Sequence, residues 1–332
     1  MSRPHRQSTL RWQAGAVLWL ASLCPARAQA DLEDLRDELR QSATAARYPA
    51  FLAALIGLNS EAELSGSNLR DESDPSTEFQ LFTVPWKREL GEGWLGASWQ
   101  LEATLGYSTA RSQARGVLED LDPQLSTDVD SRFQIFGATV GVGPRLALGE
   151  RYELTTTLEL GLAYVENDTR YGGRGAPLLA ALADGILFNW QATYALSGLG
   201  LALERERWLW SGLAFEPLLR ADVRVSTALD ADDRSQEGSE WTGWWVAQMR
   251  MRGPAPVRVA GTPLDWSTHL SYKRFANEAA ELLDFADYFE VGFVLTALEL
   301  ESVPLVSSAS LHGALILGED ISGWSLGLGA SF

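Results

Sequence analysis

The chain of 332 residues has little cysteine, histidine or methionine, and it has no long hydrophobic run. A single cysteine, Cys24, excludes an intramolecular disulfide and any metal site built on several thiolates. Only His269 and His312 follow the first thirty residues, and they are not spaced as a metal-binding pair. No later segment approaches 18 consecutive apolar residues, so helical membrane spans are not expected. The sequence predicts neither a metal site nor a cofactor.

Basic residues are also scarce. The chain has 27 lysines and arginines against 44 aspartates and glutamates, a formal net charge of -17. A nucleic-acid-binding protein typically carries a basic surface, so nucleic acid is not an expected partner.

The first thirty residues have the pattern of a secretory signal peptide. Arg3, Arg6 and Arg11 precede an apolar run over residues 14–23, and residues 28–30 read Ala-Gln-Ala before Asp31. The run is too short for a spanning helix, which needs about 20 apolar residues. We therefore expect residues 1–30 to be removed on export.

The remaining chain alternates apolar and polar residues with a period of two. Residues 94–107 give the clearest case, WLGASWQLEATLGY, which an amphipathic helix would not produce. The same pattern predicts twelve strands, at residues 48–59, 77–86, 94–108, 132–146, 151–164, 184–204, 208–226, 241–252, 264–274, 286–297, 305–317 and 322–332. The first is the weakest, because PAFLAALIGL also fits a short helix.

The fold class that follows is an all-β, transmembrane, up-and-down antiparallel barrel over residues 48–332. Strands of about ten residues, tilted by about 40°, cross the apolar band of an outer-membrane barrel. The last strand would pair with the first, leaving no free edge. Its apolar residues, with the final aromatic residue, form the expected signal for barrel assembly: Trp324, Leu326, Leu328 and Phe332.

The predicted connectors alternate between long and short, which places both chain ends in the periplasm and the long loops outside. The long connectors sum to a charge of about -16 and the short ones to about -1, so nearly all the net negative charge of the connectors lies on the long ones, among them residues 60–76, 118–130 and 228–240. They form either a solvated surface or a site where divalent cations bridge to phosphorylated lipid.

Residues 31–47 can form one helix, with Leu32, Leu35 and Leu39 along one stripe. The helix would lie in the periplasm or enter the lumen as a plug, and we favour the plug.

Strand parity predicts the residues that line the lumen. They include Glu102, Glu153, Glu159, Gln191, Arg220, Asp222, Arg224, Gln248, Arg250, Arg252, Asp265, His269, Lys273 and Glu290. Seven of them lie on three consecutive strands and would give a mainly basic wall opposite glutamates from earlier strands: Arg220, Asp222, Arg224, Arg250, Arg252, Asp265 and Lys273. These charges form either structural ion pairs or a narrow pore for small anions.

A catalytic site has little support. Ser267 and Ser271 flank His269 on its own strand face, at about 6.6 to 7 Å of rise, which is too far for a hydrogen bond. A triad would need partners such as Asp222 or Glu290 from other strands. We assign no catalytic residue.

The aromatic residues favour a membrane-interface girdle over a sugar-binding platform. The tryptophans near predicted strand ends are Trp86, Trp94, Trp208, Trp210, Trp241, Trp244, Trp245, Trp266 and Trp324.

With the terminal strand WSLGLGASF, the signal peptide and the strand count, the chain resembles the solitary autotransporter-like β-barrel proteins. The resemblance implies an outer-membrane location and contacts with lipid and the barrel-assembly machinery. Autotransporters carry a large exported domain ahead of the barrel, whereas about 17 residues separate the signal peptide from it here. We predict a structural or narrow-pore barrel; the alternatives are a surface adhesion or ligand-binding barrel and a barrel-embedded hydrolase.

Overall fold

The structure, a computed structural model, describes residues 31–45, 64–71, 77–93, 97–119, 122–259, 262–276, 285–298 and 308–331. Its helices are α2 (Asp31–Ala45), the short 3-10 helix η2 (Pro123–Leu125) and α4 (Ala176–Ala183). Its strands are β1 (Leu64–Asp71), β2 (Glu78–Glu92), β3 (Ser98–Val117), β4 (Thr127–Leu148), β5 (Tyr152–Gly173), β6 (Trp190–Arg205), β7 (Trp208–Trp210), β8 (Leu213–Ala231), β9 (Ser239–Val259), β10 (Thr262–Ala276), β11 (Asp287–Leu298), β12 (Ser308–Leu317) and β13 (Ile321–Ser331).

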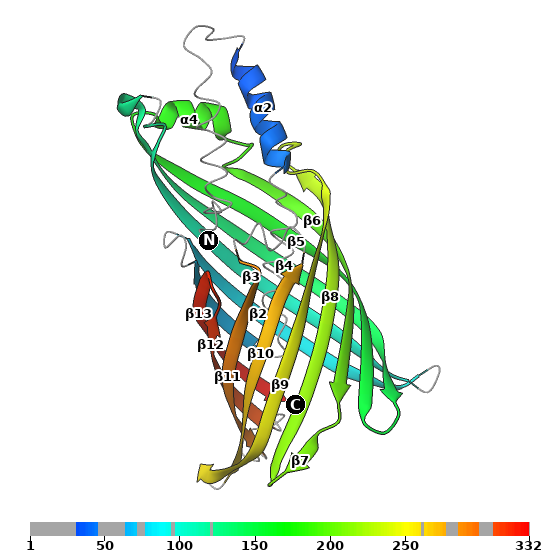
Figure 1. Ribbon diagram of the computed structural model, residues 1–332. Helices are drawn as coiled ribbons and strands as arrows, with labels where there is room; N and C mark the ends of the chain where they lie inside the picture. Colours follow the sequence, from blue (N-terminus) through cyan, green and yellow to red (C-terminus); the bar gives the residue numbers. More distant parts are fainter. Residues whose placement is uncertain are drawn as a thin grey trace, which may run out of the picture.

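The strands form one closed antiparallel sheet (Figure 1). Neighbouring strands pair in chain order, β1 pairs with β13, and β6 pairs with β8, so twelve strands close the barrel and β7 is a short addition to β8. We call the end where α4 joins β5 to β6 the α4 rim, and the opposite end the β7 rim. The predicted fold class and strand number are confirmed.

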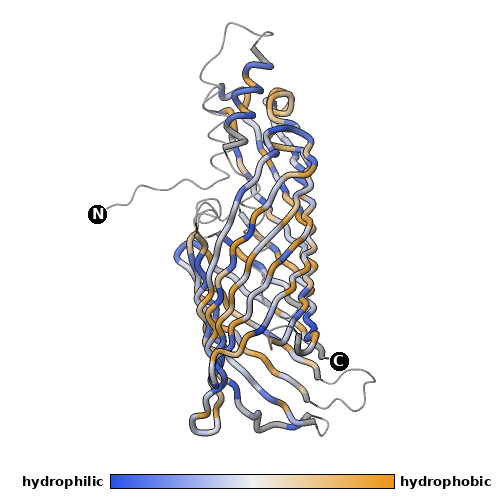
Figure 2. Tube along the Cα trace, turned by 90° about the vertical axis from the view of Figure 1, so that its right-hand side faces the viewer, coloured by the Kyte–Doolittle hydropathy of each residue, from blue (hydrophilic) through white to orange (hydrophobic). Residues whose placement is uncertain are grey.

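Alternating burial defines two faces on every long strand. On β5 the residues Leu158, Leu160 and Leu162 are more than half exposed, whereas Ala163 and Val165, which follow them on the opposite face of the strand, are buried. In a closed barrel the buried face lines the lumen, and the exposed apolar face contacts lipid. Hydrophobic positions follow the whole wall (Figure 2).

A lipid-facing aromatic row marks one boundary of the apolar belt. Phe82, Tyr107, Phe136 and Tyr164 lie in direct register on β2, β3, β4 and β5. Beyond this row, toward the α4 rim, the outward residues of β5 are polar: Glu166, Asp168 and Arg170. The tall wall formed by these strands therefore rises past the lipid-facing belt.

Six of the tryptophans predicted for the girdle are exposed, as a girdle requires, namely Trp86, Trp208, Trp210, Trp241, Trp245 and Trp324. Trp266 is half-buried, and Trp94 lies outside the described residues. Trp244 was assigned wrongly: its side chain is buried in the lumen, where it lies beside the guanidinium of Arg224.

The first barrel strand is Leu64–Asp71, in a segment that we expected to be an acidic loop. The expected strand at residues 48–59 lies outside the described residues. The segment LSGSNLRD forms a strand because β13 and β2 supply hydrogen-bonding partners on both of its sides. Two other expected loops also shorten, since residues 127–130 belong to β4 and residues 228–231 to β8.

The strand expected at residues 184–204 begins only at Trp190, after helix α4, which the sequence did not predict. Its parity was also wrong: Gln191 is exposed, whereas Trp190, Ala192, Tyr194 and Leu196 are buried on the lumen side. The strand expected at residues 208–226 is interrupted at Ser211 and Gly212, whose positive φ angles form the turn between β7 and β8.

None of the helices in the described residues is long and apolar enough to cross a membrane.

Candidate functional site in the barrel lumen

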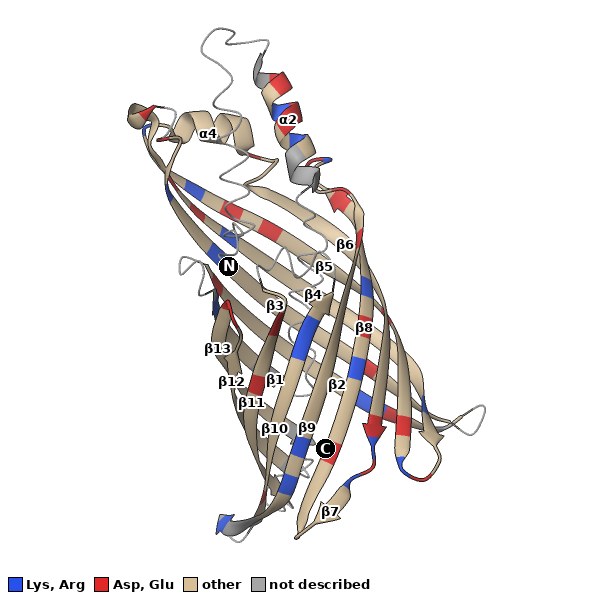
Figure 3. Cartoon of the chain, in the orientation of Figure 1, with Lys and Arg blue, Asp and Glu red and all other residues tan. Residues whose placement is uncertain are grey.

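The lumen has two chemically different halves. In the half toward the α4 rim the inward side chains are mostly apolar, and we call them the hydrophobic layer: Leu69, Phe79, Leu81, Phe133, Ile135, Val165, Trp190, Tyr194, Trp244, Val246, Phe275, Tyr288, Ile316 and Ile321. In the half toward the β7 rim the inward side chains are mostly charged or polar. Figure 3 shows the charged positions along β8 and near the lower end of β9.

Helix α2 covers the α4 rim instead of entering the lumen or extending from the other end (Figure 1). Leu39 is 1% exposed and belongs to the hydrophobic layer's cluster, with Leu35 packed against it. Arg36 donates hydrogen bonds to the last carbonyls of α4, at 2.7 Å to Ala181 and 3.2 Å to Leu182. Leu35 and Leu39 of the predicted stripe thus belong to or pack against this cluster, the side chain of Leu32 lies outside the described part of the structure, and Arg36 caps α4.

Ion pairs fasten α2 to the connector between β8 and β9. Arg40 lies 2.7 Å from Asp37 and 3.0 Å from Asp233, and Arg234 lies 2.7 Å from Asp37. The hydrogen bond from Arg40 lowers the pKa of Asp37. Burial raises the pKa of Asp233, but hydrogen bonds from Ser235 and Arg40 outweigh it and lower the pKa overall. Both carboxylates therefore favour the docked helix at neutral pH, and this contribution is lost only as the pH falls through their lowered pKa values.

Ion pairs also cross the charged half of the lumen. The Nη2 of Arg224 on β8 donates to both carboxylate oxygens of Glu159 on β5, at 2.8 and 2.7 Å. Arg220 makes a two-point contact with Asp222 at 2.7 and 2.9 Å. The Nζ of Lys87 lies 3.2 Å from Glu102. Four of the predicted lumen residues thus pair with one another, namely Arg220 with Asp222 and Arg224 with Glu159, and Glu102 has its partner, Lys87, on β2.

A polar cavity of about 630 Å³, which we call the vestibule, opens at the β7 rim. Arg145 pairs there with Glu89 at 2.6 Å and with Glu153. The other charged or polar residues lining the cavity are Glu150, Arg151, Glu204, Arg205, Glu206, Arg207, Glu216, Gln248 and Arg250. The vestibule has comparable numbers of arginines and glutamates, so it is not the basic wall expected from the sequence.

The structure places the remaining predicted lumen residues at separate points. Arg252 lies 3.9 Å from Glu216, and Asp265 lies opposite Pro254 on β9. Lys273 is buried, with its Nζ 5.7 Å from the centre of the Tyr288 ring.

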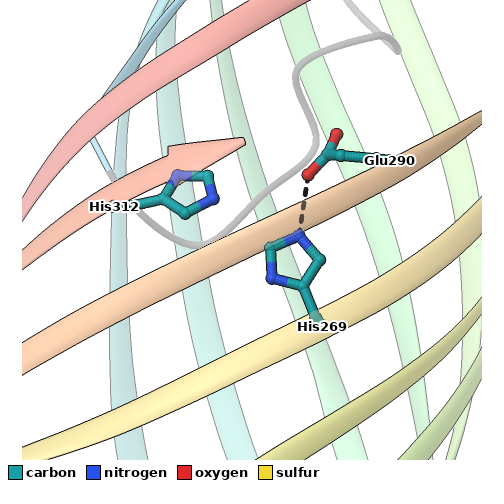
Figure 4. A group of neighbouring side chains, drawn as sticks. All are labelled: His269, Glu290 and His312. Carbon is teal, nitrogen blue, oxygen red and sulfur yellow. Dashed lines mark hydrogen bonds and ion pairs between the residues drawn. The ribbon is translucent and has the colours of Figure 1, made fainter. Parts of the chain in front are cut away.

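His269, Glu290 and His312 form a buried cluster on three adjacent strands (Figure 4). The Nε2 of His269 lies 2.9 Å from Glu290 Oε1, and the two imidazole rings are 5.5 Å apart between centroids. The sequence placed both histidines on inward positions but did not group them, because they are far apart in the chain and their relative height depends on strand register.

At the terminal strand, Trp324, Leu326 and Leu328 are exposed on the lipid-facing side, and Phe332 lies outside the described residues. The pairing of this strand with β1 completes the ring.

Comparison with known proteins gives a family and a fold. Residues 58–328 match the family described as "Solitary outer membrane autotransporter beta-barrel domain". The translocator domain of autotransporter NalP from Neisseria meningitidis is similar, with a TM-score of 0.50 and 10% identity over 88% of this chain and 97% of that one. The transport unit of the autotransporter AIDA-I from Escherichia coli has a TM-score of 0.42 and 11% identity, with 100% of both chains covered. Comparison with curated protein sequences gave no match.

Proposed function

The chain belongs to the family of solitary outer membrane autotransporter beta-barrel domains, and on this premise we propose that it is a structural barrel whose lumen is closed at rest. The observation that carries the proposal is the hydrophobic layer, into which Leu39 of α2 packs. A dry apolar constriction is a barrier to ions, because a hydrated ion that enters it must lose its water.

Charge pairing in the rest of the lumen supports the same conclusion. A pore for small anions needs cations that face the permeating ion. Here Arg224 is held by Glu159, and Arg220 by Asp222, so their charges are already compensated. The Arg224–Glu159 pair braces β5 against β8 across the intervening strand β6, whereas Arg220 and Asp222 pair within β8. The structural interpretation is therefore favoured over the narrow pore for anions.

The proposal also assigns an orientation. The α4 rim faces outside, because α4 lies on one of the longer connectors and outer-membrane barrels keep their long loops on the external side.

The proposal also covers export and the contacts of the barrel. Residues 1–30 act as a cleaved signal peptide, and the terminal strand is presented to the barrel-assembly machinery. Lipid contacts the belt below the aromatic row. The acidic residues of α2 and of residues 228–240 are then at the surface, where divalent cations can bridge them to lipid phosphates.

Planar-bilayer recording of the refolded mature chain tests the proposal. The wild-type protein is expected to give no steady conductance. An L39E variant places a carboxylate in the hydrophobic layer, so it should loosen α2 and produce openings. E38Q changes the neighbouring exposed position on the same helix and serves as the matched control.

Folding is checked by gel mobility with and without boiling. A steady, porin-like wild-type conductance would overturn the closed state. If L39E gives no more conductance than E38Q, then α2 does not help to close the lumen.

A further inference from the structure

The buried cluster of His269, Glu290 and His312 brings three metal-ligating side chains to one point of the lumen wall. They come from the inward faces of β10, β11 and β12, which are consecutive in the sheet. One ligand atom from each residue lies within 4.8 Å of the other two. A tetrahedral ion with bonds of about 2.1 Å would need these atoms about 3.4 Å apart, so small side-chain rotations would close the site.

Gly292 creates the space that lets the two rings meet. It lies on β11 directly opposite His269 of β10, and on its other side it pairs with Ala314 of β12. A Cβ at Gly292 would lie 2.1 Å from His269 Cε1 and 2.6 Å from His269 Nε2. The imidazole of His269 therefore lies over a glycine, where any other residue would displace it.

His312 provides the second, independent observation. Its side chain is 5% exposed, and its Nε2 has no hydrogen-bond partner within the described part of the chain. A buried polar nitrogen without a partner costs free energy, because the bond to water lost on folding is not replaced. A bound cation would satisfy this nitrogen directly.

We propose that His269, Glu290 and His312 bind one divalent transition-metal ion, for which Zn²⁺ is the best fit. Two imidazoles and one carboxylate, with a fourth position left for water, match the ligands and coordination number that Zn²⁺ adopts in proteins. On binding, His269 would present Nε2 to the ion as the imidazole tautomer protonated at Nδ1, and Glu290 would bind as the carboxylate, so the ion replaces the proton shared in the contact between His269 Nε2 and Glu290.

Two cationic side chains lie near the site. Lys273 interacts with Glu290, and Arg250 on β9 is the register partner of His269. Arg250 also lines the vestibule, so the ion can reach the site from the β7 rim. Because both cations oppose a bound metal, affinity must come from the three ligands.

The ion would join β10, β11 and β12 at mid-height. These strands lead into the seam where β13 pairs with β1, and β1 contributes only eight residues to that pairing. Metal binding should therefore stabilise the part of the barrel with the shortest strands.

Zn²⁺ titration of the refolded full-length mature chain, followed by competition with a chromogenic chelator, tests the site. Wild type should bind one equivalent. H269A and H312Q should each lose affinity by at least about 100-fold, the upper end of the loss seen when even an outer-shell partner is removed. E102Q removes a lumen carboxylate on β3, far from the cluster in the sheet, and should bind like wild type.

Equal affinities in wild type, H312Q and E102Q would overturn the proposal, as would wild type that binds no Zn²⁺. If the histidine variants do not fold, X-ray absorption of wild type with Zn²⁺ decides. A spectrum that shows two imidazole ligands on the bound Zn²⁺ supports the site. A spectrum without imidazole ligands contradicts the proposal.

Discussion

An E159L variant is expected to unfold with a free energy about 3 kcal/mol below that of wild type, since removing one member of a buried ion pair leaves the other charge without compensation. The side chain of Arg224 is only 9% exposed, and both oxygens of Glu159 accept from its Nη2. The Nη1 of Arg224 is also buried, and it has no hydrogen-bond partner within the described residues that could compensate for the loss of Glu159. Urea unfolding in lipid vesicles, followed by tryptophan fluorescence, measures the change.

The double variant E159L/R224L should recover most of the loss, because two apolar side chains replace two charges. D130N is the matched control: it breaks the exposed pair with Arg111, which is equally short at 2.6 Å. Such an exposed pair contributes about 1 kcal/mol or less. If E159L and D130N lower the free energy of unfolding by similar amounts, then water solvates Arg224 in the lumen and the pair is not a buried one.

A G143A variant is expected to lose about 3 kcal/mol of unfolding free energy, near the upper end for overpacking a tightly packed site. The added Cβ would lie 1.5 Å from the carbonyl oxygen of Thr156 and 2.6 Å from its carbonyl carbon. Both are backbone atoms, so β4 and β5 must separate, whereas a flexible side chain could have rotated away.

G106A is the control for this substitution. Gly106 lies on the neighbouring strand β3, and an added Cβ there meets nothing closer than 4.0 Å. It should unfold within about 0.5 kcal/mol of wild type, as do substitutions that disturb no packing. Equal losses for the two variants would mean that β4 and β5 do not approach each other as closely as described.

The sequence predicts which residues of a strand face the lumen and which face lipid wherever one face of the strand is polar. In β5 the leucines at 158, 160 and 162 alternate with Glu159, so the sequence determines which face meets lipid. In β6 the apolar residues change face: Tyr194 and Leu196 point inward, whereas Leu199 and Leu201 point outward. The period-two rule fails there because the hydrophobic layer makes both faces apolar.

The first strand could not be found by hydrophobicity. LSGSNLRD has only two leucines, and it is a strand because its neighbours pair with it. The segment PAFLAALIGL is more hydrophobic, and for this reason the first strand was predicted at residues 48–59. The strand count and the pairing of the first with the last strand were predicted correctly, since closure requires both.

The histidine cluster shows the same limit. Both histidines and Glu290 were assigned to inward positions of consecutive strands, and the sheet order is confirmed. Their meeting depends on register: Gly292 lies opposite His269, and Val294 lies opposite His312. Register is set by turns and packing, and a single sequence does not reveal it.

The two-part lumen is the central claim, and single-cysteine labelling tests it most directly. Without residues 1–30 the chain has no cysteine, so E216C in the vestibule, A192C beside the hydrophobic layer and L158C on the lipid face each carry one thiol. In lipid vesicles a charged maleimide should label E216C rapidly, and should label A192C and L158C only after unfolding. Labelling of A192C at the rate of E216C in the folded barrel would contradict the account.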